Sequence, residues 1–514
     1  MVFGAIIVSA VFFFFHSRFA NASNAAIEDP PASKVSQAPA DLHLAREIDR
    51  IIGESDAVKA RWGVFVMSMS DGRVLYSHDG ENLFTPASNM KIFTTAAALD
   101  LLGPEYRWRT SAYADAQIDG RGEVNNLVLY GRGAPDLDSK EKGSLPALAD
   151  QLYQRGLRHV RGNIIGDANY FRGDLYGSGW QWNDLQWYFG AEPSALSIDE
   201  NTVEVTIAPA TKVGSSADVL ITPNDNYLRL TNNTKTGDHD APTSVGIIRD
   251  LSGNDLRVWG EFPTRGRAFS AFLSIHDPAL RAATLLKQAL IARGITVDGK
   301  PQSRDARTAE NEKFDPQKAI ELAYVESKTL GDAVRKTNKE SNNLYAELIL
   351  RTLGKERGTY APDADPRKNR TRGDDQAGAA VLKMWLQRHG IPTNSLAVHD
   401  GSGLSRLNLV TAESAARLLV AISKTGASAV FRDSLPIAGR DGTLGGRMTS
   451  EAGRVLAKTG TLTYAHSLSG YALTKNGEVL AFSILCNDAA GQSHPIRTID
   501  AIARLLAAYD AATP

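Results

Sequence analysis

A serine and a lysine three positions apart could act as a nucleophile and its base near the start of the chain. Ser88 and Lys91 lie in FTPASNMKIFTTAAALDLLGP, where Pro86 suits a helix start and an alanine-rich helix body follows. Residues three apart on a helix face the same side, and a lysine whose pKa is lowered by burial or by a second cation can take the proton of a serine hydroxyl. The free N–H groups of a helix N-terminus could stabilise the negative charge that develops. The pattern alone is weak, because Ser139 and Lys142 repeat it in a polar loop.

A second useful lysine could come from one of three copies of Lys-Thr-Gly. Lys235 lies among Asn, Thr, Asp and His residues, a turn composition that predicts a solvated surface group. Lys424 lies in the last turn of a predicted amphipathic helix, where its charge is favourable against the helix dipole. Lys458 lies in RVLAKTGTLTY, a predicted strand, so it alone offers a cation in line with hydroxyls and accessible backbone. We expect Gly460 to let a ligand backbone approach without a Cβ in the way.

A third motif, Ser-x-Asn, places Ser341 and Asn343 at the entry to a predicted helix. Serine and asparagine there more often cap the helix than catalyse a reaction, and Ser252 and Asn254 repeat the pattern elsewhere. The order of the three motifs is more specific than any one of them. Ser-x-x-K at a helix start, then Ser-x-Asn, then Lys-Thr-Gly on a strand is the active-site set of penicillin-recognising serine enzymes.

The three motifs lie far apart in the sequence, so strands and helices from both ends of the chain must fold together to bring them into one site. A chain of 514 residues is too long for one compact core. Strands and helices near each end bracket a long middle region in which short apolar runs alternate with turn clusters. We therefore expect one α/β catalytic domain made from both ends, with further domains inserted between them.

The sequence resembles the low-molecular-mass class C penicillin-binding proteins, which are D-alanyl-D-alanine carboxypeptidase/endopeptidases. The long interval between Ser88 and Ser341 matches the inserted domains of that family, and HDGSGLSRLNLVTA (399–412) resembles its Asp-Gly-Ser-Gly-Leu-Ser signature. GWQWNDLQWYFGAEPSAL resembles its Trp-x-x-Asn-Asp segment, and LVLYGRGAPDLD resembles a motif of its inserted domain, with Ala134 where aspartate is usual. The likeness covers nearly everything after residue 40.

The resemblance implies an α/β fold. A β-lactamase-like serine transpeptidase domain, an antiparallel sheet flanked by helices, would carry two β-rich domains inserted between the Ser-x-x-K and Ser-x-Asn motifs. The implied segments are 41–105 and 315–514 for the penicillin-binding catalytic domain, 106–200 and 272–314 for inserted domain II, and 201–271 for inserted β-rich domain III.

The resemblance also implies a role for each motif residue. Ser88 would attack the carbonyl of a D-Ala-D-Ala or D-Ala-diaminopimelate bond, with Lys91 as general base. Ser341 would relay the proton to the leaving amine, and Asn343 would hold Lys91 and the substrate amide. The acyl-enzyme would then be cleaved by water.

The strand carrying the third motif would bind the substrate. Lys458, with Thr459 and Thr461, would bind the terminal carboxylate and keep the electrostatic potential of the site positive. The N–H groups of Ser88 and Thr461 would form the oxyanion hole. No metal or other cofactor is implied, and the sequence has no Cys/His cluster that suggests one. The expected partners are peptidoglycan stem peptides and covalently binding β-lactams.

Four further positions match a family pocket for the zwitterionic side-chain end of a wall peptide. The resemblance implies that Asp184 and Arg406 supply the opposite charges and that Phe189 and Leu404 form an apolar wall. Thr463 stands where relatives can carry a glutamine, so this side of the pocket is expected to differ.

Two other functions remain open on the sequence alone. A β-lactamase uses the same residues but turns penicillin over, usually with a dedicated carboxylate base that the sequence does not identify. A catalytically silent scaffold that binds the cell wall is the second alternative, although the complete motif set argues against it.

The N-terminus predicts export. VFGAIIVSAVFFFF precedes a small-x-small site ending at Ala22, so residues 1–22 are expected to be a signal peptide and 23–40 a flexible leader, which places the protein in the periplasm. An uncleaved anchor with loose membrane association is the alternative, because no Lys or Arg precedes the apolar run. The net charge of −1 gives no reason to expect nucleic acid, and the single cysteine, Cys486, excludes an intramolecular disulfide. The oligomeric state is left open.

Overall fold

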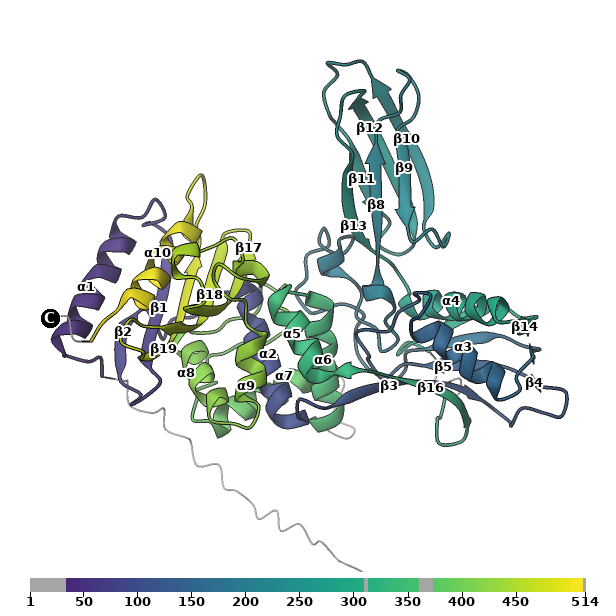
Figure 1. The fold of residues 1–514 in the computed structure, drawn as a ribbon, viewed down its shortest axis with the longest axis horizontal. Coiled ribbons are helices and arrows are strands. Elements are labelled where there is room, and N and C mark those ends of the chain that lie inside the picture. The colour runs from purple at the N-terminus through teal and green to yellow at the C-terminus, as the bar shows by residue number, and fades with distance from the viewer. Residues whose placement is uncertain (1–33, 309–312, 360–372, 512–514) are drawn as a thin grey trace, which may run out of the picture. The chain divides into compact units, whose positions relative to one another are not determined.

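The computed structural model describes residues 34–308, 313–359 and 373–511 (Figure 1). The predicted signal peptide and most of the predicted leader lie outside these ranges. In the ranges that are described, no helix combines the length and the apolar character needed to cross a membrane.

One five-stranded sheet is built from both ends of the chain, as the sequence predicted for one domain. Its five strands run in the order β17-β18-β19-β1-β2, and all neighbours are antiparallel. Trp62 pairs with Cys486, so strands from the first and last parts of the chain are hydrogen-bonded directly. The strands are β1 (Arg61–Ser68), β2 (Val74–His78), β17 (Val455–Leu462), β18 (Ala465–Leu473) and β19 (Val479–Asn487).

Two terminal helices, α1 (Pro39–Gly53) and α10 (Pro495–Ala508), cover one face of this sheet. Residues 35–40 differ from the predicted flexible leader: Val35 forms a bridge with Val74, and α1 begins at Pro39. The reason is local, because proline suits the first helical turn and Leu44 and Ile48, at helical spacing, bury against the sheet.

Helices cover the other face of the sheet and form the largest core. At its centre is α2, whose residues from Met90 to Leu99 are all buried, as expected for a helix that other helices surround. The helices of this part are α2 (Met90–Leu102), α5 (Leu330–Lys339), α6 (Asn343–Arg357), α7 (Asp374–Arg388), α8 (Ala412–Ser423) and α9 (Ser428–Ser434).

A second five-stranded sheet, in the order β15-β7-β5-β3-β16, lies between the Ser-x-x-K and Ser-x-Asn motifs in sequence. Two helices pack on it around a separate core, and a small sheet in the order β14-β6-β4 adjoins it. The elements are β3 (Arg107–Ala114), β4 (Glu123–Val124), β5 (Leu127–Tyr130), α3 (Ser144–Gln154), β6 (His159–Val160), β7 (Ile164–Asp167), α4 (Pro278–Ala292), β14 (Thr296–Val297), β15 (Pro301–Arg304) and β16 (Ile320–Thr329).

Strand β16 belongs to the second sheet and not to the catalytic domain to which the sequence assigned it. The sequence assigned residues 315–514 to the catalytic domain, whereas β16 pairs antiparallel with β3, and Leu322 and Ala323 are buried in the core of the second sheet. This pairing joins residues far apart in sequence, which local periodicity cannot reveal.

Two three-stranded sheets form a third β-rich part with its own small core. Their orders are β13-β8-β9 and β10-β12-β11, with β10 and β12 parallel. The strands are β8 (Thr202–Ala208), β9 (Asp218–Thr222), β10 (Arg229–Gly237), β11 (Gly246–Arg249), β12 (Asp255–Pro263) and β13 (Phe269–Ser274). Short 3-10 turns complete the description: η1 (Ala87–Asn89), η2 (Tyr188–Gly190), η3 (Asp199–Asn201), η5 (Gly442–Leu444) and η6 (Thr449–Glu451).

Candidate active site

Ser88 and Lys91 meet where a 3-10 turn leads into the central helix. Ser88 lies in η1, which directly precedes α2, and Lys91 lies in the first turn of α2. The Nζ of Lys91 donates a hydrogen bond to Ser88 Oγ at 3.0 Å. The structure therefore holds the predicted nucleophile and base in direct contact.

Lys91 is fully buried, and its amine is surrounded by oxygen acceptors. Besides Ser88, it donates to Asn343 Oδ1 at 2.6 Å and to the backbone carbonyl of Ser402 at 2.7 Å. Burial lowers the pKa of Lys91 to about 7, although the carboxylates of Asp400 and Glu347 act in the opposite direction. A substantial fraction of the amine is then neutral near pH 7, as a general base requires.

The Ser-x-Asn motif forms a tight turn between α5 and α6. Ser341 has a φ of 61°, in the left-handed region, and Asn342 caps α6 by accepting the N–H of Tyr345 at 3.0 Å. Asn343 follows as the first residue of the helix and donates from Nδ2 to the carbonyl of Phe189 at 2.8 Å. The capping role that the sequence allowed for this motif thus falls to its middle residue, and the outer two stay available to the site.

Lys458 reaches the same place from the edge strand β17. Its side chain is fully buried, and its Nζ donates to Ser341 Oγ at 2.9 Å and to the carbonyl of Thr459 at 2.9 Å. Burial, and secondarily the nearby Lys91 amine, hold the pKa of Lys458 well below its usual range. Two amines this close in a buried site do not both keep their protons at neutral pH.

Gly460 also allows two segments of the chain to pack closely. A Cβ at this position would lie 2.8 Å from the carbonyl oxygen of Pro86 and 3.0 Å from the backbone nitrogen of Ser88, and closer still to Ser467 Oγ. The close approach is thus made by the protein's own chain, because β17 presses against η1. This contact brings the backbone nitrogen of Ser88 beside Gly460, the residue before Thr461 on β17.

The other two Lys-Thr-Gly copies lie apart from this cluster. Lys424 is exposed and is the C-cap of α8, directly after the last helical turn, in which the sequence had placed it. Lys235 is exposed, but it lies on strand β10 and not in a turn, because the alternating Thr234 and Thr236 bury their side chains.

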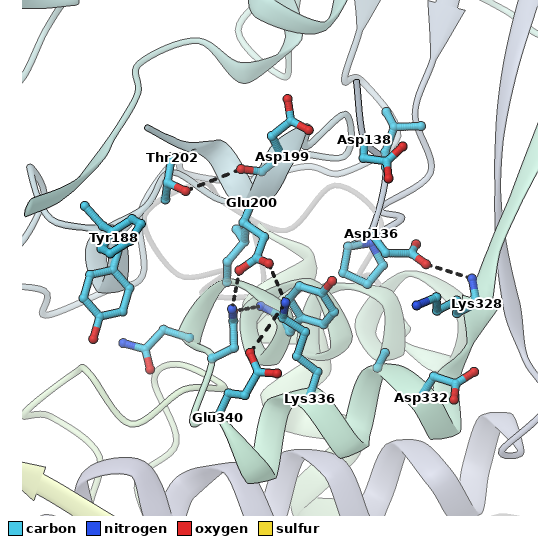
Figure 2. A pocket seen from close by; sticks show the side chains of 18 of the residues that line it. Asp136, Asp138, Tyr188, Asp199, Glu200, Thr202, Lys328, Asp332, Lys336 and Glu340 are labelled. Atoms are coloured by element: carbon cyan, nitrogen blue, oxygen red, sulfur yellow. Dashed lines mark hydrogen bonds and ion pairs between the residues drawn. The ribbon is translucent and has the colours of Figure 1, made fainter. Parts of the chain in front are cut away.

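A glutamate of the inserted part is bonded to the Ser-x-Asn turn. Glu200 accepts hydrogen bonds from Lys336 Nζ at 2.5 Å and from Asn342 Nδ2 at 2.7 Å (Figure 2). It lies in η3 with a φ of 55°, and the buried Asn201 beside it donates to the carbonyl of Glu192 at 2.9 Å. The inserted part therefore holds the residue that directly follows Ser341.

The four residues predicted to form a side-chain pocket have different surroundings. Leu404 is buried, Phe189 is half-buried and bonded through its carbonyl to Asn343, and Arg406 donates to the carbonyl of Thr463 at 3.0 Å. Burial raises the pKa of the Asp184 carboxyl, and the charge of Arg406 partly opposes this shift. The two opposite charges are thus near enough to influence each other.

The comparisons with known proteins agree with this geometry. The profile of the D-Ala-D-Ala carboxypeptidase 3 (S13) family matches residues 44–509. The chain belongs to this family. A D-alanyl-D-alanine carboxypeptidase from an Actinomadura species is 34% identical over 479 residues, which cover 91% of this chain and 85% of the relative.

Solved structures show the same fold. Penicillin binding protein 4 from Haemophilus influenzae has a TM-score of 0.75 at 24% identity, with 90% of this chain and 99% of that chain covered. A structure of the same protein in complex with a β-lactam gives 0.70 at 23% identity, with 90% and 98% covered. The predicted family, the fold class and the assignment as a serine-type D-Ala-D-Ala carboxypeptidase are therefore confirmed.

In this carboxypeptidase, a loop behind the nucleophile is held by one aspartate. Asp400 accepts hydrogen bonds from Trp180 Nε1 at 2.9 Å, the backbone N–H of Gly403 at 2.8 Å and Asn408 Nδ2 at 2.5 Å. The same loop also contacts the base, because the carbonyl of Ser402 accepts a hydrogen bond from Lys91.

Glu347 is the residue that sequence reasoning missed. It is fully buried on α6, one turn after Asn343, and its Oε1 accepts the N–H groups of Gly401 and Ser402, both at 2.9 Å. Burial raises the pKa of Glu347 to about 8. Its spacing from Asn343 on a helix was the only sequence signal, and it is too common to single out one glutamate.

Proposed function

We propose that the carboxypeptidase acts through an acyl-enzyme on Ser88 and that it also cleaves D,D-crosslinks between peptidoglycan peptides. The observation that carries this proposal is the 3.0 Å contact between Ser88 Oγ and a buried lysine amine, Lys91, whose pKa is about 7. A serine hydroxyl becomes an effective nucleophile when such a base can take its proton.

The reaction follows from this contact. Neutral Lys91 takes the Ser88 proton as Oγ bonds to the carbonyl carbon, and the carbonyl oxygen becomes an oxyanion that accepts the N–H groups of Ser88 and Thr461. When the C–N bond breaks, Ser341 passes a proton to the leaving amine and regains one from the neighbouring lysines. Water then adds to the ester and releases Ser88.

The substrate's own carboxylate sets the charge of the two lysines. A carboxylate beside Lys458 favours the protonated form of that amine, and the resulting cation disfavours protonation of Lys91. Substrate binding therefore selects the arrangement that the chemistry needs, a cation at Lys458 and a free base at Lys91. Thr459 Oγ1, at 2.7 Å from Thr443 Oγ1, is positioned by that hydroxyl to take part in the same binding.

The residues Asp184, Phe189, Leu404 and Arg406 would bind the side-chain end of the acyl half of the substrate. A half-buried acid and a nearby arginine suit a zwitterion, since each end meets the opposite charge. In Asp184→Ala and Arg406→Ala, turnover of a diaminopimelate peptide should fall more than turnover of a simple diacyl-D-Ala-D-Ala. Equal losses for both substrates would remove this pocket from the proposal.

The proposed setting is the periplasm, with wall peptides and β-lactams as the molecules that reach Ser88. The support is the apolar N-terminal run followed by a small-x-small site, and the β-lactam complex of penicillin binding protein 4 from Haemophilus influenzae. Cleavage after Ala22 should give a mature protein that begins at Ser23. N-terminal sequencing of the protein from a periplasmic extract tests this, and a protein found only uncleaved in membranes would contradict it.

The test of the whole proposal combines labelling with product analysis. Fluorescent penicillin should label the wild type stably and fail to label Ser88→Ala, and mass spectrometry should show loss of terminal D-Ala from uncrosslinked muropeptides and separation of crosslinked ones. Rapid turnover of penicillin would instead indicate a β-lactamase. Absence of both labelling and products would indicate a silent scaffold.

A further inference from the structure

A large cavity lies between the helices that carry the Ser-x-Asn turn and the inserted part. Figure 2 shows side chains that line it. Its volume is about 1280 Å³. One wall is formed by α5 and the start of α6, and the other by segments 135–140 and 199–204 together with Tyr188 and Phe272. None of the catalytic roles described above uses this space.

The cavity is held in a fixed position relative to the reacting groups. Asn343, which binds Lys91, lines the cavity, and Asn342 beside it is bonded to Glu200 on the opposite wall. Gly442 also lines it, directly before Thr443, whose hydroxyl contacts Thr459. Glu340 and Asn342, on either side of Ser341 in the chain, both line the cavity, so it begins next to the residue that would pass a proton to the leaving amine.

The walls offer both apolar contact and charge. Tyr188 and Phe272 are 56% and 50% exposed and lie edge to face, with ring centroids 6.4 Å apart. Lys140 and Lys328 are exposed on the same walls, and the buried Oδ1 of Asp136 has no hydrogen-bond partner among the described residues. The lining also holds eight carboxylates, those of Asp136, Asp138, Asp199, Glu200, Glu204, Asp332, Glu340 and Asp441. Exposed aromatic rings together with charges of both signs suit a peptide that carries both ammonium and carboxylate groups.

We propose that this cavity binds the second stem peptide of a crosslinked substrate, the peptide that leaves with the amine when the D,D-bond is cut. The proposal rests on the proposed function, because it extends the leaving-group side of the same site. A lone D-Ala leaving group is too small to reach the cavity, whereas a second stem peptide attached through its amine continues past Ser341 toward Phe272 and Lys328.

The test compares a crosslinked dimer with an uncrosslinked pentapeptide, both as defined muropeptides. In Phe272→Ala and in the double variant Lys140→Ala, Lys328→Ala, KM for the dimer should rise about tenfold with kcat unchanged, and the constants for the pentapeptide should change less than about twofold. The rate of acylation by penicillin should be unaffected.

Matched controls come from the same inserted part. Trp259 and Lys235 are exposed and do not line the cavity, so Trp259→Ala and Lys235→Ala should leave both substrates unaffected. Equal changes for dimer and pentapeptide, or no change for the dimer, would overturn the proposal. The variants could also be tested on a muropeptide that keeps its disaccharide but lacks the second peptide. An unchanged effect of the substitutions on KM for that compound would indicate a glycan site and would also overturn the proposal.

The outcome for the wild type separates this proposal from the function on which it rests. A wild type that releases D-Ala from the pentapeptide but does not cut the dimer overturns the cavity proposal and leaves the carboxypeptidase intact. A wild type that acts on neither substrate and is not labelled by penicillin overturns both.

Discussion

The buried lysine cluster and the open cavity beside it differ in how they hold charge. Lys91 and Lys458 are fully buried, so burial lowers the pKa of each amine. In the cavity, Lys336 is only partly buried and is paired with Glu200, whose side chain is 38% exposed. The difference indicates separate roles for the two regions. Proton transfer needs groups whose pKa values are shifted by burial away from water, whereas recognition of a peptide needs side chains that remain charged.

The largest expected effect on activity comes from a substitution in the buried lysine cluster. Replacement of Lys91 by alanine removes the base, so the rate of acylation by penicillin should fall by about a thousandfold. Stopped-flow measurement with a fluorescent penicillin checks this. Lys424→Ala, in an exposed copy of the same tripeptide motif as Lys458, should acylate at the wild-type rate, and an equal loss in both variants would contradict the assignment.

Gly460→Ala tests whether the buried site depends on close packing of two chain segments. The added Cβ would meet the carbonyl of Pro86, so η1 and β17 must separate, and acylation should slow by about tenfold or more while the free energy of unfolding drops by about 1–3 kcal/mol. Gly446→Ala is the control, because a Cβ there meets nothing within 4 Å. Acylation and urea unfolding are the two measurements.

The pH dependence of acylation should show the titration of Lys91. The neutral amine is the active base, so below pH 7 the rate should rise about tenfold per pH unit and it should level off above the pKa of about 7. A flat profile between about pH 5 and pH 9 would show that the amine is not the base.

The smallest expected effect on activity comes from a substitution in the cavity lining. Glu200→Ala removes the acceptor of Asn342 and Lys336, so kcat should fall by about threefold to tenfold through a looser Ser341 turn, a modest loss because the pair is partly exposed. Glu200→Gln should recover part of the activity, since its amide oxygen can still accept a hydrogen bond from Asn342. Glu141→Ala, which removes an exposed acid outside the cavity lining, should behave as wild type in the same steady-state assay.

The sequence predicted what short-range signals determine. Ser88 and Lys91 are less than one helical turn apart, and Lys458 lies within the predicted strand RVLAKTGTLTY, so the local pattern was enough to place these motifs. The position of β16, the packing partner of Gly460 and the role of Glu347 depend on contacts between segments far apart in the chain. Such contacts leave no periodic trace in a single sequence, which is why these three features could be found only in the structure.

The direct pairing of Trp62 with Cys486 has a consequence for how the chain folds. Strand β1 has no partner on one side until the last strand arrives, so a nascent or truncated chain exposes an unsatisfied edge through most of its synthesis. The second and third β-rich parts can form their own sheets meanwhile. The middle parts of the chain should therefore fold before the catalytic sheet is complete. Ser88 would reach its final surroundings only when β19, the last strand, pairs with β1.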